Sequence, residues 1–292
     1  MNASMPTQAR TRHFTRREGW LAGAAAVLLA LGLAAPDLAA DAYSGGASLS
    51  DVRTLMGLPN AIDVLSNLPF LLAGIWGLLL LHRVERRHDH HPGHARCLAH
   101  DELPGSALDC AWLFFAGLLL VAAASAFYHL QPDDMLRLAG DRAAMAVTFA
   151  GVIGLAVCDR VSQRAGWPAA CITLAAGLLA VAVFHETGNV TPWAVVQFGG
   201  IALVLWMAAL RPVRGATRPL HLKLGWIIAA YGLAKAFELA DGAVYDLTQH
   251  LVSGHSLKHV AATLAALPVI GALRQLASQP LMHNPRAAAV TI

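Results

Sequence analysis

Long apolar runs separated by short polar segments fill most of the chain. An apolar run at residues 20–35 is followed by seven more, at 61–81, 108–129, 141–159, 167–186, 192–210, 222–241 and 255–273. Helices of about twenty apolar residues are long enough to cross a hydrocarbon core of about 30 Å. None of the runs shows the alternation typical of a strand. The pattern therefore predicts an all-α membrane protein, a bundle of seven transmembrane helices preceded by one further segment.

The N-terminal segment has two readings that stay open. Residues 1–18 are polar and basic, and the apolar run behind them ends in Ala39-Ala40-Asp41. This is the pattern of a secretory signal peptide with a small-residue cleavage site, and equally of an extra transmembrane helix. The rest of the chain is predicted to divide into a periplasmic connector at 41–60, a seven-helix domain at 61–273 and a cytoplasmic tail at 274–292.

Composition supports the membrane assignment and excludes one class of partner. The chain is 57% hydrophobic and 13% charged, whereas soluble domains are about 25% charged. The net charge is only +3, and the arginines sit in short loops rather than along one basic face. We therefore expect no nucleic-acid partner.

The basic residues predict the orientation in the membrane. One side of the bundle carries most of them in its short connections and tail: Arg83, Arg86, Arg87, Arg96, Arg160, Arg164, Arg211, Arg214, Arg218, Lys223, Arg274 and Arg286. The other side has only Arg53, Arg137 and Arg142, with Lys258 inside the seventh span. Because short cytoplasmic loops are enriched in Lys and Arg, the first side is predicted to be cytoplasmic. This fits a bacterial inner-membrane protein whose other face meets the periplasm.

Polar residues inside the spans gather at that periplasmic face. They are Ser125 and His129 at the end of the second span, Asp141 at the start of the third, His255, Lys258 and His259 at the start of the seventh, Asn60, Asp63, Ser66 and Asn67 at the start of the first, His185 and Glu186 at the end of the fourth, and Lys235, Glu238 and Asp241 at the end of the sixth. Polar groups are costly in a membrane and are therefore functional candidates.

Three of these residues predict a metal site. His255 and His259 are four residues apart, so their rings lie one above the other on one helix face. With His129 they supply three imidazoles, and a catalytic zinc uses three protein ligands and one open position. Zinc so held lowers the pKa of water and polarises a carbonyl. Each histidine alone would more simply be a polar helix end, and His185 and His250 are further histidines nearby.

The other candidates have both a catalytic and a structural reading. Asp141 is placed to accept a proton from water, and Ser125, one turn before His129, is placed to stabilise an oxyanion. Ser125 could instead bond the carbonyl four residues back.

Two further groups are candidates for supporting the site. Asp63 and Asn67 either cap a helix start, as Asn60 and Ser66 also could, or orient the metal ligands. Lys235, Glu238 and Asp241 either pair with one another or with Arg142, or contact a substrate. The histidine-rich segment at 82–100 is predicted to be a solvated cytoplasmic loop, with metal binding as the alternative reading.

At these residues the sequence resembles the alkaline ceramidase family, part of a membrane-hydrolase superfamily that includes the progestin and adipoQ receptors. The likeness covers roughly residues 50–273 and lies in Ser-x-x-x-His at Ser125 and His129, Asp141, and His-x-x-x-His at His255 and His259. Ser66-Asn67-Leu68-Pro69-Phe70 is similar to the family's first-helix signature. The resemblance implies seven helices, zinc on the three histidines, and hydrolysis of an amide in a membrane lipid such as ceramide, a sphingolipid.

The chain also departs from that family. Eukaryotic ceramidases carry Trp-Cys-Glu-x-Asn, linked to calcium, where this chain has Ser50-Asp51-Val52-Arg53. Calcium is therefore doubtful, with Asp51, Asn60 and Asp63 as its only remnant. The sequence is more similar to a bacterial branch, which leaves the N-acyl lipid open. A lipid-sensing receptor without turnover is the first rival function. A transporter is the second, but it needs polar groups through the full membrane depth.

Overall fold

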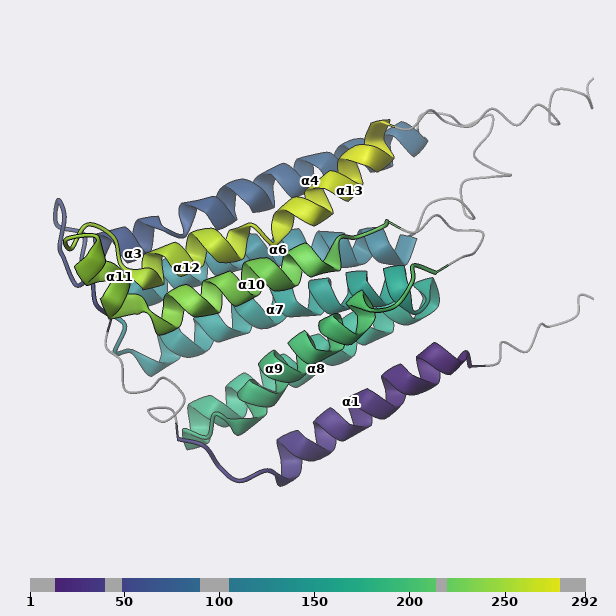
Figure 1. The fold of residues 1–292 in the computed structure, drawn as a ribbon, viewed down its shortest axis with the longest axis horizontal. Helices are drawn as coiled ribbons and strands as arrows, with labels where there is room; N and C mark the ends of the chain where they lie inside the picture. Colours follow the sequence, from purple (N-terminus) through teal and green to yellow (C-terminus); the bar gives the residue numbers. More distant parts are fainter. Residues whose placement is uncertain (1–13, 40–48, 90–104, 214–219, 279–292) are drawn as a thin grey trace, which may run out of the picture.

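The computed structural model describes residues 14–39, 49–89, 105–213 and 220–278, which form one bundle of helices (Figure 1). The helices are α1 (Arg16–Ala34), α3 (Ala61–Leu65), α4 (Leu68–Asp89), α6 (Gly105–His129), α7 (Met135–Arg160), α8 (Gln163–Thr187), α9 (Thr191–Ala208), α10 (Leu224–Leu239), α11 (Asp241–Leu247), α12 (Gly254–Thr263) and α13 (Ala266–Ser278). The described residues form no strand beyond two isolated bridges. The predicted all-α fold is confirmed.

Seven helical segments of the described chain are long and apolar enough to cross a membrane. These are α1, α3 with α4, α6, α7, α8, α9, and α12 with α13. Helix α10 packs in the same bundle against α9 and α12. It has 16 residues, which corresponds to about 24 Å. The segment before residue 40 is therefore a helix of membrane-spanning length, as are six of the seven predicted spans, whereas α10, the sixth predicted span, is shorter.

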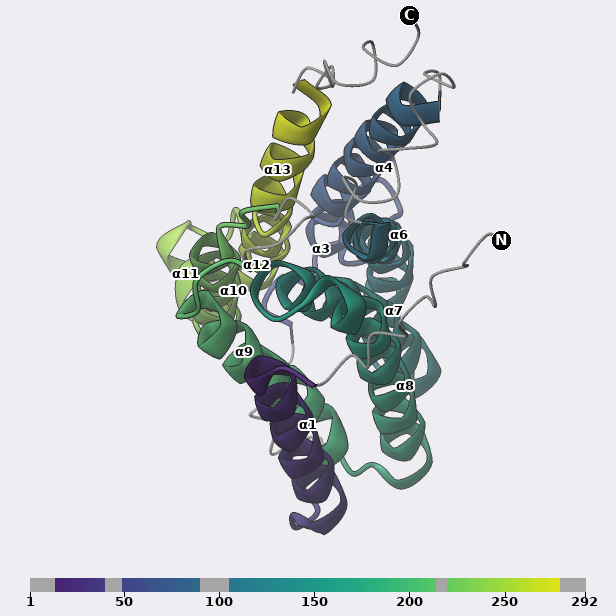
Figure 2. The same ribbon diagram turned by 90° about the vertical axis from the view of Figure 1, so that its right-hand side faces the viewer.

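Helix α7 lies at the centre of the bundle and contacts α6, α8 and α9 (Figure 2). It is the most buried of the long helices, with 61% of its most apolar window inside the protein. The core beside it contains Phe114 and Phe115 of α6, Leu155 of α7 and Leu273 of α13. Helix α1 is the outermost element and packs on α9, with 6% of its window buried.

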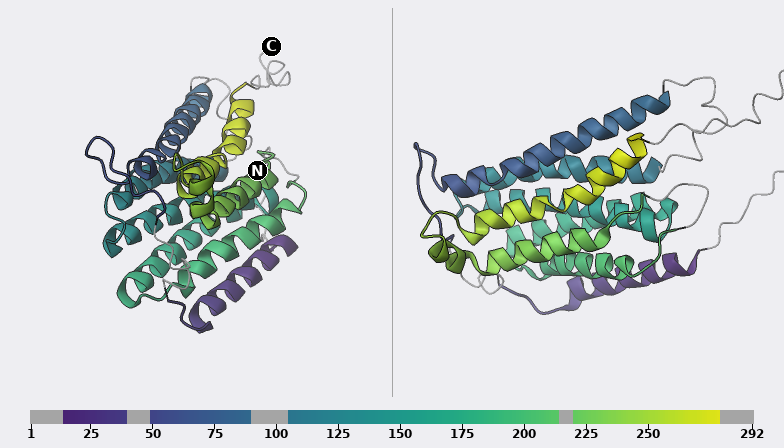
Figure 3. Two further views of the ribbon diagram at one scale, coloured as in Figure 1. Left: turned by 60° about the vertical axis from the view of Figure 1, so that its left-hand side comes forward. Right: turned by 45° about the horizontal axis from the view of Figure 1, so that its top comes forward.

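Two predicted spans are broken into pairs of helices. The first is interrupted at residues 66–67, between α3 and α4. The last is interrupted between α12 and α13, where the two yellow helices differ in direction (Figure 3). Pro268 has no N–H to donate to the Leu264 carbonyl oxygen, and its ring crowds that carbonyl, which disfavours a continuous straight helix there. The breaks confine α3 and α12 to one end of the bundle.

Several predicted boundaries were wrong by half a dozen residues or more. Helix α7 begins at Met135 rather than 141, because the Asp134 side chain accepts hydrogen bonds from the backbone N–H groups of Leu136 and Arg137 at 2.9 and 3.1 Å. Asp141 therefore lies in the second turn of a helix and not at its mouth.

The other shifted boundaries are C-terminal ends of helices, which lie later in the chain than predicted. Helix α4 continues to Asp89, so His82 and His88 are helical rather than part of a loop. Helix α13 continues to Ser278, which includes the first residues of the predicted tail. The remaining parts of that loop and tail, 90–104 and 279–292, lie outside the described residues.

Two ends of the bundle are distinguished below. The site end contains the starts of α3, α7 and α12 and the ends of α6 and α10, at the left of Figure 1. The opposite end contains the starts of α1, α6 and α8 and the ends of α7 and α13.

Candidate metal centre

Three histidines meet at the site end. His129 is the last residue of α6, and His255 and His259 lie one turn apart on α12. Their potential ligand atoms all lie within 4.8 Å of one another. The Nε2 atoms of His129 and His255 are 3.3 Å apart, and two nitrogens bound to one tetrahedral zinc are separated by roughly the same distance. The group is thus close enough to bind a metal ion after a small inward movement of its rings.

A serine that precedes α4 fixes the ring of His259. Ser66 Oγ donates to the Asp63 carbonyl oxygen at 2.7 Å and lies 2.7 Å from His259 Nδ1. Because the hydroxyl has given its one proton to Asp63, its oxygen must accept the Nδ1–H of His259. The Nε2 atom of His259 then carries the free lone pair, which is the form that binds a metal.

The Asp63 side chain holds the start of α12. Asp63 is fully buried, and its Oδ1 accepts hydrogen bonds from Ser256 Oγ at 2.5 Å and Ser253 Oγ at 3.2 Å. Ser253 also caps α12 by accepting the Ser256 N–H at 3.0 Å. These contacts fix α12 against α3, and so set the position of both α12 histidines relative to the rest of the site.

Asp241 and Gly254 fix the same helix start from the side of α10 and α11. Asp241 Oδ1 accepts the backbone N–H of His255 at 2.6 Å. A Cβ atom at Gly254 would lie 2.3 Å from the Phe237 carbonyl oxygen and 2.7 Å from Asp241 Cα. Only glycine permits this approach, so the residue before His255 brings α12 into contact with the end of α10.

Asn60 fixes the third histidine through its backbone. Its side-chain amide donates to the carbonyl oxygen of His129 at 2.8 Å, which ties the end of α6 to the start of α3. Asn60 itself has φ 46°, a left-handed conformation that asparagine tolerates better than most residues, and it makes no side-chain cap. The Nδ1 atom of His129 is buried and has no partner among the described residues.

Asp141 and Ser125 lie beside the histidines on adjoining helices. Ser125 of α6 is buried, whereas Asp141 of α7 is half-buried as a whole residue. Asp141 Oδ1 is buried without a hydrogen-bond partner in the described part of the chain. A buried carboxylate oxygen that is left unsatisfied next to possible metal ligands can accept a proton or a hydrogen bond from a bound molecule.

A group of three charged side chains borders the cluster. Glu238 of α10 pairs with Lys235 of the same helix, and its Oε1 lies 3.2 Å from Lys258 Nζ of α12. Lys258 Nζ is also 3.0 Å from His255 Nε2. The sequence-based expectation that Lys235 and Glu238 pair is confirmed. Asp241 does not join them, because its carboxylate holds the start of α12 instead.

The three residues named as a remnant calcium site are each engaged elsewhere. Asp51 makes an ion pair with Arg53 at 2.6 Å, and Arg53 also donates to the Leu251 carbonyl oxygen at 2.8 Å. Burial raises the pKa of Asp51, but hydrogen bonds from Arg53 and its charge outweigh burial and leave that pKa below its usual value. Asn60 and the Oδ1 atom of Asp63 make the contacts given above.

The remaining residues that the sequence singled out lie outside the group of three histidines. His185 is exposed on α8, and His250 lies against Asp246 at 3.4 Å, so neither joins the metal cluster. Asn67 donates to the Asp63 carbonyl oxygen at 2.9 Å and terminates α3 rather than capping a helix start. The sequence analysis did not predict the supporting roles of Ser253 and Ser256. A serine just before a predicted helix, followed by another serine three residues later, is the sequence signal that could have indicated them.

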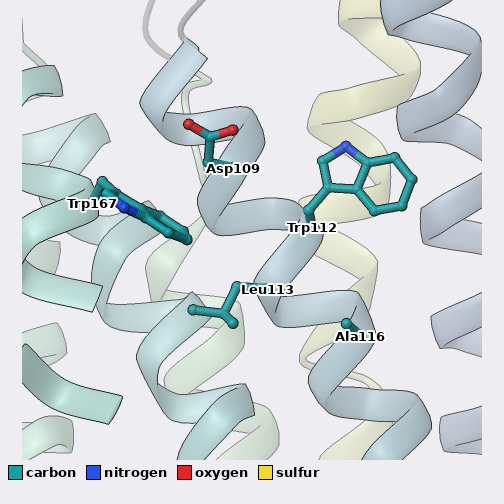
Figure 4. A pocket seen from close by; sticks show the side chains of 5 residues that line it. All are labelled: Asp109, Trp112, Leu113, Ala116 and Trp167. Atoms are coloured by element: carbon teal, nitrogen blue, oxygen red, sulfur yellow. The ribbon is translucent and has the colours of Figure 1, made fainter. Parts of the chain in front are cut away.

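A groove in the described part of the chain lies far from these residues. It is an open groove of about 520 Å³ on α6 and α8, lined by Asp109, Trp112, Leu113, Ala116 and Trp167 (Figure 4). Asp109 precedes His129 on α6 by twenty residues, which corresponds to about 30 Å. The groove therefore belongs to the opposite end of the bundle.

Comparison with known proteins adds no family assignment. No protein-family model matches the chain, and no curated protein sequence matches it.

Proposed function

We propose that this protein is a zinc-dependent membrane hydrolase that cleaves the amide bond of an N-acyl lipid such as a ceramide. The observation that carries the proposal is the group of three histidines at the end of α6 and the start of α12, with the buried Asp141 carboxylate beside it. The order of these residues along the chain, which resembles that of the alkaline ceramidases, supports the same reaction.

His129, His255 and His259 are the residues that would hold the ion. Three neutral imidazoles and one open position are typical of catalytic zinc, whereas structural zinc has four protein ligands. When bound there, zinc supplies Lewis acidity to the amide carbonyl and lowers the pKa of water to about 7. Ser66 supports this assignment because it keeps the Nε2 lone pair of His259 available.

The chain's own groups carry the proton and the developing charge. Asp141 takes a proton from the attacking water and returns it to the nitrogen of the leaving amine, so that water and amide become fatty acid and amine. Ser125 donates a hydrogen bond to the carbonyl oxygen as negative charge develops on it. The burial of Ser125 and of the Asp141 Oδ1 atom supports these roles, since excluding water strengthens such interactions.

The position of the site suits a lipid substrate. The histidines lie at the site end of membrane-length helices. In a bilayer this end would lie at the level where the amide of an N-acyl lipid meets the headgroup region. Phe127 and Leu136, close to the site in the chain, are 53% and 69% exposed and can contact acyl chains. The distribution of basic residues would place this end at the periplasmic face of a bacterial inner membrane.

Release of fatty acid from defined lipids tests the proposal. Purified protein with one zinc per chain, in detergent or reconstituted bilayers, is incubated with ceramides, N-acyl amino acids and N-acyl phosphatidylethanolamines. We expect time-dependent fatty acid from at least one of them, abolished by chelation and restored by zinc. If zinc-loaded protein releases nothing from any lipid, the hydrolase proposal fails and a lipid-sensing receptor becomes the better reading.

A further inference from the structure

In the described part of the chain, the charged side chain of Lys258 is in direct contact with a histidine of the cluster, and the proposed hydrolysis does not use this lysine. It lies between His255 and His259 on α12, and its Nζ is 3.0 Å from His255 Nε2. Its other near contacts are Glu238 at 3.2 Å and His255 Nδ1 at 3.4 Å. The side chain is 20% exposed, so a molecule bound at the site can reach it.

The charge around this lysine becomes positive only when a metal binds. Both Lys258 and Lys235 contact the single carboxylate of Glu238. Asp141 and Arg142 of α7 lie at the same end, and Asp63 and Asp241 hold the start of α12. Counted as ionised, three cations therefore stand against four carboxylates. Three neutral imidazoles do not offset the charge of a divalent ion, which would change this local charge from one negative to one positive.

Metal binding would release Lys258 from its histidine. The atom that it contacts, His255 Nε2, is also the atom that faces His129 Nε2 at 3.3 Å. A nitrogen that gives its lone pair to a metal cannot also accept a hydrogen bond. Glu238 already shares its oxygens with Lys235, so the Lys258 ammonium is left with donors to spare beside the cluster.

We propose that Lys258, supported by Lys235 through Glu238, recognises an anionic group next to the scissile amide. This inference rests on the proposed function and names its substrate class: N-acyl lipids with a carboxylate or phosphate near the amide, in preference to neutral ceramide. Charge-assisted hydrogen bonds from an ammonium to such a group are among the stronger polar contacts available to a protein.

Three lipids with the same acyl chain and the same amide test it. N-palmitoylglycine carries a carboxylate, phosphorylated N-palmitoylethanolamine carries a phosphate, and N-palmitoylethanolamine is neutral. We expect kcat/KM to favour an anionic lipid by about tenfold or more, and the better of the two identifies the anion. Lys258→Met should lower kcat/KM for that lipid about 10- to 100-fold and change it little for the neutral one.

Matched variants separate recognition from packing. Lys258→Arg keeps the charge and should retain most of the preference, whereas Lys223→Met, at the opposite end of the bundle, should behave as wild type. Lys235→Met should reduce the preference less than Lys258→Met, and it carries the test if Lys258→Met does not fold. An equal loss for charged and neutral lipids in Lys258→Met would show a merely structural contact and overturn the inference.

A binding measurement keeps this inference separate from the proposed hydrolysis. Calorimetric titration of zinc-loaded Asp141→Asn protein with N-palmitoylglycine and N-palmitoylethanolamine should show tighter binding of the anionic lipid, lost when Lys258→Met is added. Such binding without turnover in wild type would retain the inference and refute the hydrolase. Turnover in wild type with equal kcat/KM and equal affinity for the two lipids would do the reverse.

Discussion

The two ends of the bundle differ in how completely their buried polar atoms are hydrogen-bonded. At the opposite end, Glu18 of α1 and Asp159 of α7 use both carboxylate oxygens in hydrogen bonds. At the site end, His129 Nδ1, Asp141 Oδ1 and Asp63 Oδ2 are buried without partners among the described residues, whereas the opposite end has Gln163 Oε1 in this state. Each such group costs free energy, so a protein retains it where function requires it.

Each carboxylate oxygen of Glu18 accepts two hydrogen bonds. Its Oε1 accepts from Ser162 Oγ at 2.6 Å and from Arg164 Nε at 2.7 Å, and its Oε2 accepts from Arg164 at 2.6 Å and from the Thr15 N–H at 2.8 Å. Arg17 beside it donates to the carbonyl oxygens of Arg160, at the end of α7, and of Arg211, after the end of α9. These contacts fasten α1 to the start of α8 and leave no atom for a ligand.

Asp159 of α7 similarly holds the chain between α9 and α10 in place through hydrogen bonds. It accepts the backbone N–H groups of His221 at 2.9 Å and Leu222 at 3.1 Å. Its neighbour Arg160 donates to the carbonyl oxygens of Leu210 and Leu222. A complete network of this kind specifies one arrangement of the helices, whereas an incomplete one is free to bind something else. The opposite end is therefore held together by complete hydrogen-bond networks, and the site end keeps polar atoms that could bind a ligand.

The largest expected effect is loss of the metal from the site end. Each of His129→Ala, His255→Ala and His259→Ala leaves two imidazoles, and we expect zinc affinity to fall by more than about 100-fold, because even outer partners of a ligand cost about 10- to 100-fold. Zinc per chain, measured by plasma emission, tests this. His185→Ala on the exposed face of α8 is the control and should keep its zinc; full zinc in His129→Ala would rule out the three-histidine site.

Removal of the carboxylate charge beside the cluster is next in size. Asp141→Asn keeps the shape of the side chain and removes the proton acceptor, so turnover should fall about 10²- to 10⁴-fold while zinc stays bound. Ser125→Ala should cost about 10²- to 10³-fold. Zinc content and fatty-acid release are measured on the same preparations. Unchanged turnover in Asp141→Asn would move the proton acceptor elsewhere, with Glu238 as the next candidate.

A smaller effect is expected from the serine that orients His259. Ser66→Ala removes the acceptor of the Nδ1–H group, and zinc affinity should fall about 10- to 100-fold, with melting temperature little changed. Competition with a chelator of known affinity measures this. Ser278→Ala, at the far end of α13, is the matched control. The same zinc affinity in Ser66→Ala and wild type would mean that the ring of His259 is oriented by packing alone.

The smallest effect on function is expected at the opposite end. Glu18→Gln breaks the pair with Arg164 and should destabilise the protein by about 1–3 kcal/mol, while zinc content and turnover stay at wild-type levels. Thermal unfolding in detergent measures the stability. A signal peptide is absent from the mature protein, so an unchanged melting temperature would indicate that residues 1–40 are removed, and a lowered one that α1 is retained.

The sequence by itself determined the helices and the principal residues of the site. Long apolar runs predict helices wherever they occur, because their burial and backbone hydrogen bonding are local properties. Because successive spans cross the membrane in alternating directions, the end of α6 and the starts of α7 and α12 were expected at the same end of the bundle. His129, His255 and His259 followed from that count and from a spacing of four along one helix.

Only the tertiary structure decided how those residues are held. Ser66 against His259, Asp63 against Ser253 and Ser256, and Asp241 against the His255 N–H join helices that are far apart in sequence. Such pairs depend on the rotation and tilt of each helix, which an apolar pattern leaves free. Asp241 was expected beside Lys235 and Glu238, but the close approach at Gly254 turned it toward α12. Helix number is a property of the chain, whereas hydrogen-bond partners are a property of the packing.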